Sequence, residues 1–345
     1  MEPRPAPIVG GRGDDRLNVV TSSEVVSFLT RPGVERIETH LSWVFRDATE
    51  VLKLKKPVLF GGLDLRAIDA RRRNCETELD LNRRFAHHVY LGVVSVCRGP
   101  DGSLHLGAPG TPVDWLVRMR RLPDQGFLDR KIASGDIDHA LVRRALSAVV
   151  RHHIWAPPAP LDADAYIRGL LAMLDRVERD LDTSAIDGGR VAATLFTLRG
   201  WVATHRGLFG RRVDEWWIVE GHGDLRPEHV CLAPEPVVID CLEFDATLRT
   251  LDAVDDLGFL ALECDQLGAR DVAATVMDLW RTESGDDFPP SLLAFYQAVR
   301  ALRRASVAAM RLREGANPAK SGVLVTRVAR YLAAAEALAN SLVAH

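Results

Sequence analysis

Two carboxylates, Asp224 and Asp240, stand where they could take part in the same chemistry. Asp224 lies in a polar loop, residues 222–229, with the sequence HGDLRPEH. Asp240 ends the apolar run 237–239. One such carboxylate can orient a nucleophile and accept its proton, while the other can hold a metal ion. The pair therefore indicates a catalytic loop followed by a metal-binding strand.

Short strands are predicted around this loop. Residues 216–219 (WWIV) and 230–232 (VCL) are apolar runs of strand length on either side of it. Residues 233–236 (APEP) then supply a turn. Residues 237–239 (VVI) run back as the hairpin partner of 230–232 and place Asp240 at their end. The hairpin brings the two carboxylates onto neighbouring backbone segments.

The N-terminal part offers a pair of basic side chains. Residues 37–45 and 50–57 are predicted to form two strands, after a short helix that opens at residues 21–24 (TSSE). Lys53 and Lys55 lie two apart in the second strand and so share one face, opposite its leucines. Paired lysines at such a position either keep an exposed edge strand hydrated or neutralise the charge of a bound phosphate.

A helix is predicted over residues 70–90, because a largely apolar set of residues recurs there at spacings of three and four and so forms one stripe. That stripe contains Cys75, Glu78, Leu79, Asn82, Phe85 and Ala86. A carboxylate on an apolar face needs a partner, since an unpaired buried charge is costly. Glu78 is thus either the ion-pair partner of a strand lysine, with Glu76 as a substitute, or a solvated edge residue.

The polar loop resembles the aminoglycoside phosphotransferase-like branch of the protein-kinase-like superfamily. The usual form in that branch is HGDLHPGN followed by an apolar strand that ends in Asp. The matching residues here are His222, Gly223, Asp224, Leu225, Pro227, Ile239 and Asp240. His229 stands where the family has its metal-binding Asn. Residues 252–258 (DAVDDLG) resemble a further family segment in which the residue matching Asp256 caps or braces the loop.

Segments 38–45, 53–58 and 78–84 are similar to an uncharacterised bacterial subgroup of this branch. Some members are fused to a P-loop kinase domain. No G-x-x-x-x-G-K-[ST] motif occurs in this sequence, so the chain is expected to be the phosphotransferase-like part alone.

The resemblance implies an α+β, two-lobed protein-kinase-like fold. Its small N-lobe has an antiparallel sheet and one helix, and its larger C-lobe is mostly helical. Residues 1–16 are expected to be a mobile tail, 17–122 the nucleotide-binding N-lobe, and 123–345 the C-lobe with the catalytic loop and substrate site. Apolar periodicity predicts the C-lobe helices at 141–154, 165–181, 191–205, 291–314 and 324–343.

The implied activity is ATP-dependent transfer of the γ-phosphate to a hydroxyl of a small molecule such as a sugar, an amino sugar or an aminoglycoside-like compound. Asp224 would be the catalytic base and Arg226 would stabilise charge on the transferred group. ATP would be bound with the help of Lys55 or Lys53, Glu78, and the backbone near Met119 and Leu122. Mg²⁺ would be held by Asp240, with His229 and Glu243 as further candidates.

Two rival functions remain open. His229 is the weak point of a magnesium site, because Mg²⁺ prefers oxygen ligands, so Glu228 or Glu243 could supply the missing oxygen. Without one, the chain could be a pseudokinase or nucleotide-binding module without turnover. A metallohydrolase built from His222, Asp224 and His229 is the third reading.

Composition limits the remaining classes. The 345 residues carry 44 Lys and Arg against 47 Asp and Glu, dispersed along the chain, which disfavours nucleic-acid and membrane-surface partners. The five cysteines are mostly far apart and form no C-x-x-C pair, which is typical of a reducing, cytoplasmic setting. No signal peptide or membrane span is expected. The oligomeric state is left open. The region after Asp240 carries several acidic residues, which favours a cationic acceptor; they are Asp245, Asp252, Glu263 and Asp265.

Overall fold

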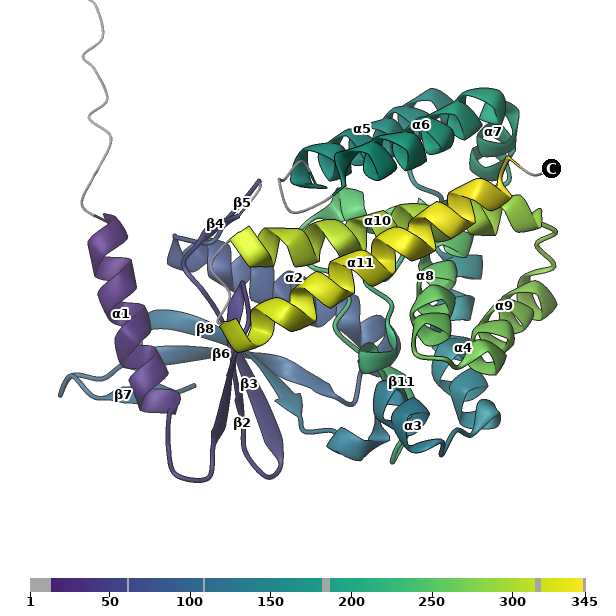
Figure 1. Cartoon of the computed structure of the whole chain (residues 1–345). Coiled ribbons are helices and arrows are strands. Elements are labelled where there is room, and N and C mark those ends of the chain that lie inside the picture. Colours follow the sequence, from purple (N-terminus) through teal and green to yellow (C-terminus); the bar gives the residue numbers. More distant parts are fainter. Residues whose placement is uncertain (1–13, 61, 108, 182–186, 314–317, 344–345) are drawn as a thin grey trace, which may run out of the picture. The chain divides into compact units, whose positions relative to one another are not determined.

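A computed structural model of the chain describes residues 14–60, 62–107, 109–181, 187–313 and 318–343 (Figure 1). Internal contacts divide the chain into two units. The first extends to Pro123 and also includes Glu243–Asp245. The second contains Asp124–Leu242 and the residues from Ala246 onward. The boundary after Pro123 lies one residue from the predicted one. The prediction cut the chain at a single point, so it did not include Glu243–Asp245 in the first unit.

The first unit is built on a six-stranded antiparallel sheet in the order β1-β2-β3-β8-β6-β7. In that order the strands are Glu35–Glu38, Ser42–Arg46, Glu50–Lys55, Thr111–Arg120, Tyr90–Arg98 and Leu104–Leu106. A separate small hairpin pairs β4 (Leu59–Phe60) with β5 (Leu63–Asp64). The predicted antiparallel sheet is therefore present.

The single strand predicted over 37–45 is wrong, because a turn divides it into β1 and β2. The Thr39 hydroxyl donates a hydrogen bond to the Ser42 carbonyl at 3.0 Å and accepts one from the Ser42 N–H at 3.0 Å. Threonine side chains that bond the backbone in this way compete with strand pairing. The Thr39 hydroxyl is thus committed to the turn.

Two helices pack on the sheet of the first unit. Helix α1 (Asp14–Leu29) begins inside the predicted tail, while residues 1–13 lie outside the described part. Its Val25 and Leu29 join Leu54 and neighbouring strand residues in one buried cluster. Helix α2 (Ile68–Ala86) lies against β8 and β6. The short helix predicted to open at residues 21–24 is thus the second half of α1, and the helix predicted over 70–90 corresponds to α2.

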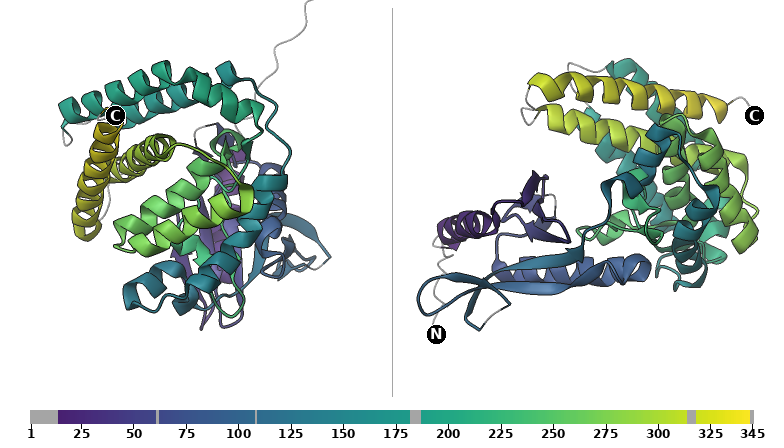
Figure 2. Two further views of the ribbon diagram at one scale, coloured as in Figure 1. Left: turned by 90° about the vertical axis from the view of Figure 1, so that its right-hand side faces the viewer. Right: turned by 90° about the horizontal axis from the view of Figure 1, so that it is seen from below.

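The second unit is mostly helical (Figure 2). Its helices are α3 (Leu128–Ser134), α4 (His139–Trp155), α5 (Ala163–Leu181), α6 (Gly188–Thr204), α7 (Arg206–Asp214), α8 (Ala253–Gln266), α9 (Arg270–Ser284), α10 (Pro290–Arg313) and α11 (Pro318–Ser341). Two short antiparallel pairs complete it: β10 (Val230–Cys231) with β11 (Val237–Val238), and β9 (Ile218–Glu220) with β12 (Thr250–Asp252). These strand pairs position the polar loop.

A buried ion-pair network anchors the start of α8. The Arg212 guanidinium donates to both oxygens of Asp252 at 2.7 Å and to Asp286 at 2.5 and 2.8 Å. Asp252 is also the N-cap of α8, since its side chain accepts from the Val254 N–H at 2.9 Å. The network therefore fixes the helix that carries Asp255 and Asp256.

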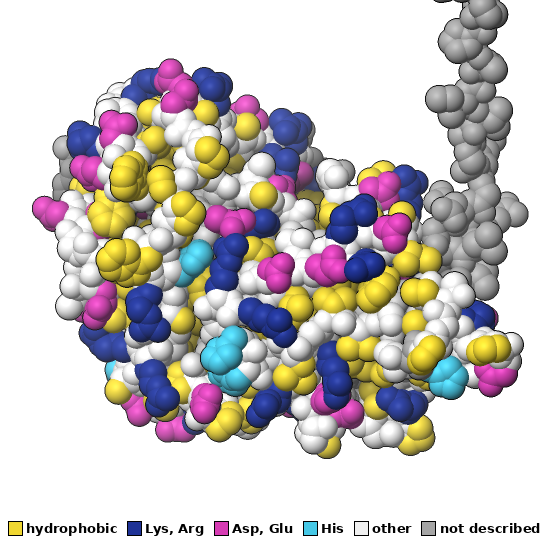
Figure 3. Space-filling view, turned by 180° about the vertical axis from the view of Figure 1, so that it is seen from behind, with side chains coloured by type: hydrophobic (Ala, Val, Ile, Leu, Met, Phe, Trp, Pro, Cys, Tyr) yellow, Lys and Arg dark blue, Asp and Glu magenta, His cyan; other side chains and the backbone are white. Residues whose placement is uncertain are grey.

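Three further observations concern the surface charges, the cysteines and the apolar character of the helices. On the face shown in Figure 3, basic and acidic side chains are interspersed, as the dispersed charges of the sequence indicate. All five cysteines lie in the described ranges; each is buried, and none forms a disulfide. Within the described ranges, no helix has both the length and the apolar character needed to cross a membrane.

Candidate active site

The predicted hairpin is confirmed and carries the polar loop at its start. Val230 pairs with Val238 and Cys231 with Val237, so β10 and β11 run antiparallel on either side of the turn. The loop itself includes a short 3₁₀ turn, η2 (Pro227–His229), whose first residue is a proline with its φ already suited to a helical turn. Loop and hairpin form one continuous support for Asp224 and Asp240.

Two glycines let the backbone of the loop pass where no side chain fits. A Cβ at Gly221 would lie 2.7 Å from the Asp256 carboxylate and 2.7 Å from the His153 ring. Gly223 has a φ of +82°, and a Cβ there would meet the backbone of Arg249 at 3.3 Å. The His-Gly-Asp motif therefore needs glycine at 223 for both its conformation and its packing.

Asp256 braces the loop, as its resemblance to the family segment implies. Its carboxylate accepts hydrogen bonds from the N–H groups of His222 at 2.6 Å and Gly223 at 3.0 Å. The His153 Nε2 atom lies 3.2 Å from the same carboxylate. Burial opposes ionisation here, but the contact with His153 outweighs it and holds the pKa of Asp256 well below its usual range. Asp256 is thus a buried, ionised anchor.

His222 connects the loop to the strand that ends in Asp240. Its Nε2–H donates to the Ile239 carbonyl at 2.9 Å, and its Nδ1 accepts from the Asp224 N–H at 3.3 Å. Burial lowers the pKa of His222, which keeps the ring neutral and able to serve as donor and acceptor at once. Both ring nitrogens are engaged by the backbone, so His222 is a structural link between the two carboxylate segments.

The Arg226 guanidinium forms ion pairs with two carboxylates of the loop, Asp224 and Glu228. Its Nη2 lies 3.0 Å and its Nε 3.1 Å from Asp224 Oδ2, and its Nη1 pairs with Glu228. Burial would raise the pKa of Asp224, yet the charge of Arg226 prevails and lowers it. Asp224 is therefore a carboxylate at neutral pH, one-third exposed and oriented by the arginine.

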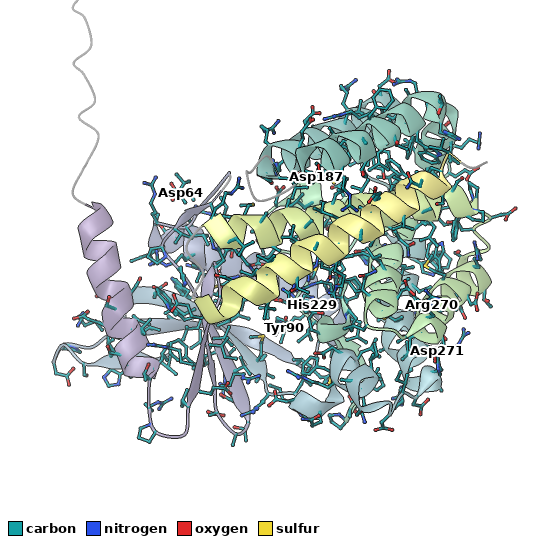
Figure 4. All side chains as sticks on the ribbon, viewed as in Figure 1. Asp64, Tyr90, Asp187, His229, Arg270 and Asp271 are labelled. Carbon is teal, nitrogen blue, oxygen red and sulfur yellow. The ribbon has the colours of Figure 1, made fainter. Side chains whose placement is uncertain are left out.

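His229 stands where the motif that the loop resembles has asparagine, and its ring contacts three residues of the loop and the following strand. Its Nδ1–H donates to the Asp224 carbonyl at 2.8 Å. Its Nε2 lies 3.0 Å from Arg226 Nη2 and 3.4 Å from Asp240 Oδ2. Because an arginine can only donate, Nε2 accepts that bond in the neutral ring. His229, labelled in Figure 4, thus contacts Asp224, Arg226 and Asp240, the three other candidate site residues of this unit.

Asp240 has the features of a single carboxylate ligand for a cation. Its φ of +63° is uncommon for a residue other than glycine, and its side chain is 44% exposed. Among the described residues, no group of three or more His, Cys, Asp or Glu side chains could hold a metal ion. Mg²⁺ often takes only one or two carboxylates and completes its shell with phosphate and water oxygens. Asp240 fits that pattern.

The first unit brings the predicted lysines and Glu78 together. Glu78 lies 2.7 Å from the Nζ of Lys53 and also pairs with Lys55. Lys55 is fully buried and pairs in addition with Glu243, the residue predicted as a metal ligand. Burial disfavours the charge, but Glu243 and Glu78 raise the pKa of Lys55 above its usual value. The predicted ion pair is confirmed, and Glu243 serves as a second counter-charge in the same unit.

The predicted adenine-binding residues differ in their backbone environment. Met119 lies inside the sheet, paired with Val51 of β3 and Tyr90 of β6. Arg121, the residue before Leu122, donates its N–H to the Thr49 carbonyl at 2.8 Å. In the described part of the chain, Leu122 makes no backbone hydrogen bond, so it is the better placed of the two predicted residues.

The arginines of α10 that lie on the side of the loop were not predicted from the sequence. Arg300 Nη1 donates to the Gly223 carbonyl at 2.9 Å, and its other nitrogens hold Asp255 at 2.6 and 2.8 Å. Arg303 and Arg304 follow on the same helix. Arginines three and four apart on an otherwise apolar helical stripe are the signal that could have revealed them.

Sequence comparisons find relatives without a described activity. No family model matches the chain. An uncharacterized protein of Mycobacterium tuberculosis is 31% identical over 291 residues, which covers 82% of this chain and 56% of the relative. An uncharacterized protein of Mycobacterium bovis matches to the same extent. The chain therefore spans about half the length of the curated relatives it matches.

Structural comparison decides the fold. A choline/ethanolamine kinase family protein from Mesorhizobium loti superposes with a TM-score of 0.52 at 16% identity, over 92% of this chain and 99% of the other. Choline kinase LicA from Streptococcus pneumoniae gives a TM-score of 0.52 at 12% identity, over 93% and 99%. The chain has a protein-kinase-like fold. The predicted fold class, with a small antiparallel-sheet unit before a larger helical one, is confirmed.

The protein-kinase-like fold agrees with the resemblance drawn from the sequence motifs. In this fold the loop containing Asp224, the following strand end at Asp240, and the lysine and glutamate of the first unit occur in the chain order that the motifs predict. The roles of the individual residues are proposals, because a fold hosts more than one function.

Proposed function

We propose that the chain is an ATP-dependent phosphotransferase that moves the γ-phosphate to a hydroxyl of a small molecule. The observation that supports this most strongly is the arrangement around Asp224. An ionised, partly exposed carboxylate is held by Arg226 at 3.0 Å, and its loop is tied through His229 to Asp240, 3.4 Å from the imidazole. The arrangement provides a base, a cation and a metal-binding carboxylate on one rigid support.

In the proposed reaction, the acceptor hydroxyl donates a hydrogen bond to Asp224. The bond from the γ-phosphorus to the bridging oxygen of ADP breaks as the bond from the acceptor oxygen to phosphorus forms, and the hydroxyl proton passes to the carboxylate. Because the pKa of Asp224 is lowered, the carboxylate contributes by orientation more than by basicity. Arg226, anchored by Asp224 and Glu228, is placed to stabilise charge on the transferred group.

The remaining residues would bind the nucleotide. Lys53, 14% exposed and paired with Glu78, and the fully buried Lys55 would neutralise phosphate charge within the first unit. The backbone of Leu122 would pair with adenine. Asp240 would hold Mg²⁺, which screens phosphate charge when bound.

The function is tested by measuring ADP release with Mg²⁺ or Mn²⁺ over a panel of sugars, amino alcohols and aminoglycosides. Acceptor-dependent ADP release is expected. The rival, a pseudokinase, predicts thermal stabilisation by ATP without ADP release under every condition. If ATP neither stabilises the protein nor supports turnover, both the phosphotransferase and the pseudokinase hypotheses are wrong.

We expect Glu78→Gln to impair nucleotide binding and to destabilise the first unit. The change leaves Lys53 and Lys55 with one shared counter-charge fewer in a buried setting, and breaking a buried ion pair typically costs about 3–5 kcal/mol. The measurements are urea unfolding and the ATP-induced shift in Tm. Glu76→Gln is the matched control, because Glu76 lies on the same helix but is 45% exposed beside Arg72. Equal behaviour of the two variants contradicts the role of Glu78.

We expect His229→Asn to keep turnover within a few-fold of the wild-type value, whereas His229→Ala loses about tenfold or more. Asparagine retains a donor for the Asp224 carbonyl, which His229 contacts at 2.8 Å, and alanine does not. The measurement is kcat for ADP release at saturating ATP. If the asparagine variant loses as much as the alanine variant, the imidazole itself is required.

A further inference from the structure

Three of the four acidic residues that favour a cationic acceptor are paired within the second unit. Asp252 is held by Arg212, and Glu263 accepts from Arg304 at 3.0 Å and from the Tyr331 hydroxyl at 2.7 Å. Asp265 pairs with the exposed Arg270 at 2.9 Å. Three of the four carboxylates on which the expectation of a cationic acceptor rests are therefore paired with arginines. The arginines of α10 that face the loop also carry positive charge close to Asp224.

Helix α10 presents three arginines on the side that meets the catalytic loop. Arg300 contacts the Gly223 carbonyl directly, at 2.9 Å. Arg303 and Arg304 are three and four residues further on, so they lie on the same helical face one turn along. Arg300 is satisfied by Asp255, and Arg304 by Glu263. Two of the three arginines thus have carboxylate partners.

Arg303 is different. Its Nη1 atom is buried and has no hydrogen-bond partner among the described residues. Burial, with repulsion from Arg300, lowers the pKa of Arg303 to about 10, against the opposing attraction of Asp255 and Asp224. The guanidinium remains charged at neutral pH. A buried, charged N–H without an acceptor costs free energy, so the fold maintains it at the expense of stability.

We infer that Arg303 receives an anionic group of the acceptor, so that the substrate is a hydroxyl compound carrying a carboxylate or a phosphate. This rests on the proposed function, which places the acceptor hydroxyl at Asp224. Asp224 is one of the two carboxylates whose charge acts on Arg303, and Arg300 joins α10 to the backbone of the residue before Asp224. An anion bound there would supply the acceptor that the Nη1–H lacks.

The test measures binding in the absence of nucleotide, so that it stands even if turnover fails. The probes are glucose, glucosamine, glucuronate and glucose 6-phosphate, which share a ring and differ in charge, together with inorganic phosphate. Each is titrated calorimetrically into wild-type protein, Arg303→Gln and Arg270→Gln. Arg270, labelled in Figure 4 at the start of α9, is 88% exposed and serves as the matched control.

Wild type and the Arg270 variant are expected to bind at least one anionic probe about tenfold or more tightly than glucose, and the Arg303 variant to lose that preference. The Tm of the Arg303 variant without ligand is expected to equal or exceed that of wild type, because an unpaired buried cation has been removed. Tighter binding of glucosamine, equal binding of every anion by wild type and Arg303→Gln, or a lowered Tm in that variant overturns the inference. ADP release, measured separately, reports on the proposed function alone.

Discussion

Asp224→Asn is expected to lower acceptor-dependent ADP release by about 10²–10⁴-fold, the usual contribution of a positioned general base. The amide has the size of the carboxylate but cannot accept the hydroxyl proton. It also weakens the hold on Arg226, now 3.0 Å from Asp224 Oδ2. One substitution therefore removes the base and loosens the cation. The measurement is kcat at saturating ATP.

The control for this variant is Asp265→Asn, which makes the same chemical change at a carboxylate 41% exposed and paired only with Arg270 among the contacts of the described residues. Exposed ion pairs contribute about 0–1 kcal/mol, so its turnover should match wild type. Both variants should retain the ATP-induced shift in Tm. Turnover by Asp224→Asn near the wild-type level would show that the transfer does not use this carboxylate.

Asp256→Asn is expected to cost about 2–4 kcal/mol of unfolding free energy at neutral pH, since one of two buried N–H groups loses a charged acceptor and the other faces an amide N–H₂. His153, whose Nε2 lies 3.2 Å from the carboxylate, also loses that contact with a carboxylate oxygen. Urea unfolding measures the difference. Asp214→Asn, at an exposed position, should remain within about 0.5 kcal/mol of wild type.

The pH dependence gives this prediction a sign. The pKa of Asp256 is lower in the folded protein than in the unfolded chain, where it is about 3.9. Its contribution is therefore fully present above about pH 5 and is lost as the pH falls below the unfolded value. The stability difference between wild type and Asp256→Asn should shrink from pH 5 towards pH 3. A difference that grows on acidification would mean that Asp256 is not an ionised anchor.

Local patterns made much of the fold and part of the site predictable. The hairpin after the loop follows from two apolar runs around a proline turn, and Glu78 follows from a carboxylate on a buried helical stripe. The alternation of Leu54 with Lys53 and Lys55 places the lysines on the face opposite the α1 cluster. Each of these inferences uses residues close together in the sequence.

The features that escaped prediction depend on long-range packing or on a single side chain. Arg300 meets Gly223 across a long stretch of sequence, and nothing local marks His153 as the partner of Asp256. The turn at Thr39 interrupts a run that alternates like one strand, because one hydroxyl bonds the backbone twice. The spacing of the arginines on α10 marks a helical face, but no local pattern identifies the distant residue that each side chain contacts.

The first unit is not a contiguous piece of the chain, because Glu243–Asp245 belongs to it. Lys55, fully buried, takes one of its two carboxylate partners from that segment. A recombination event or engineered chimera joined at Pro123 would transplant the lysine without this counter-charge, unless the new C-terminal part brought its own. An exchange of the N-terminal part at Pro123 therefore requires a C-terminal part that supplies a carboxylate partner for Lys55.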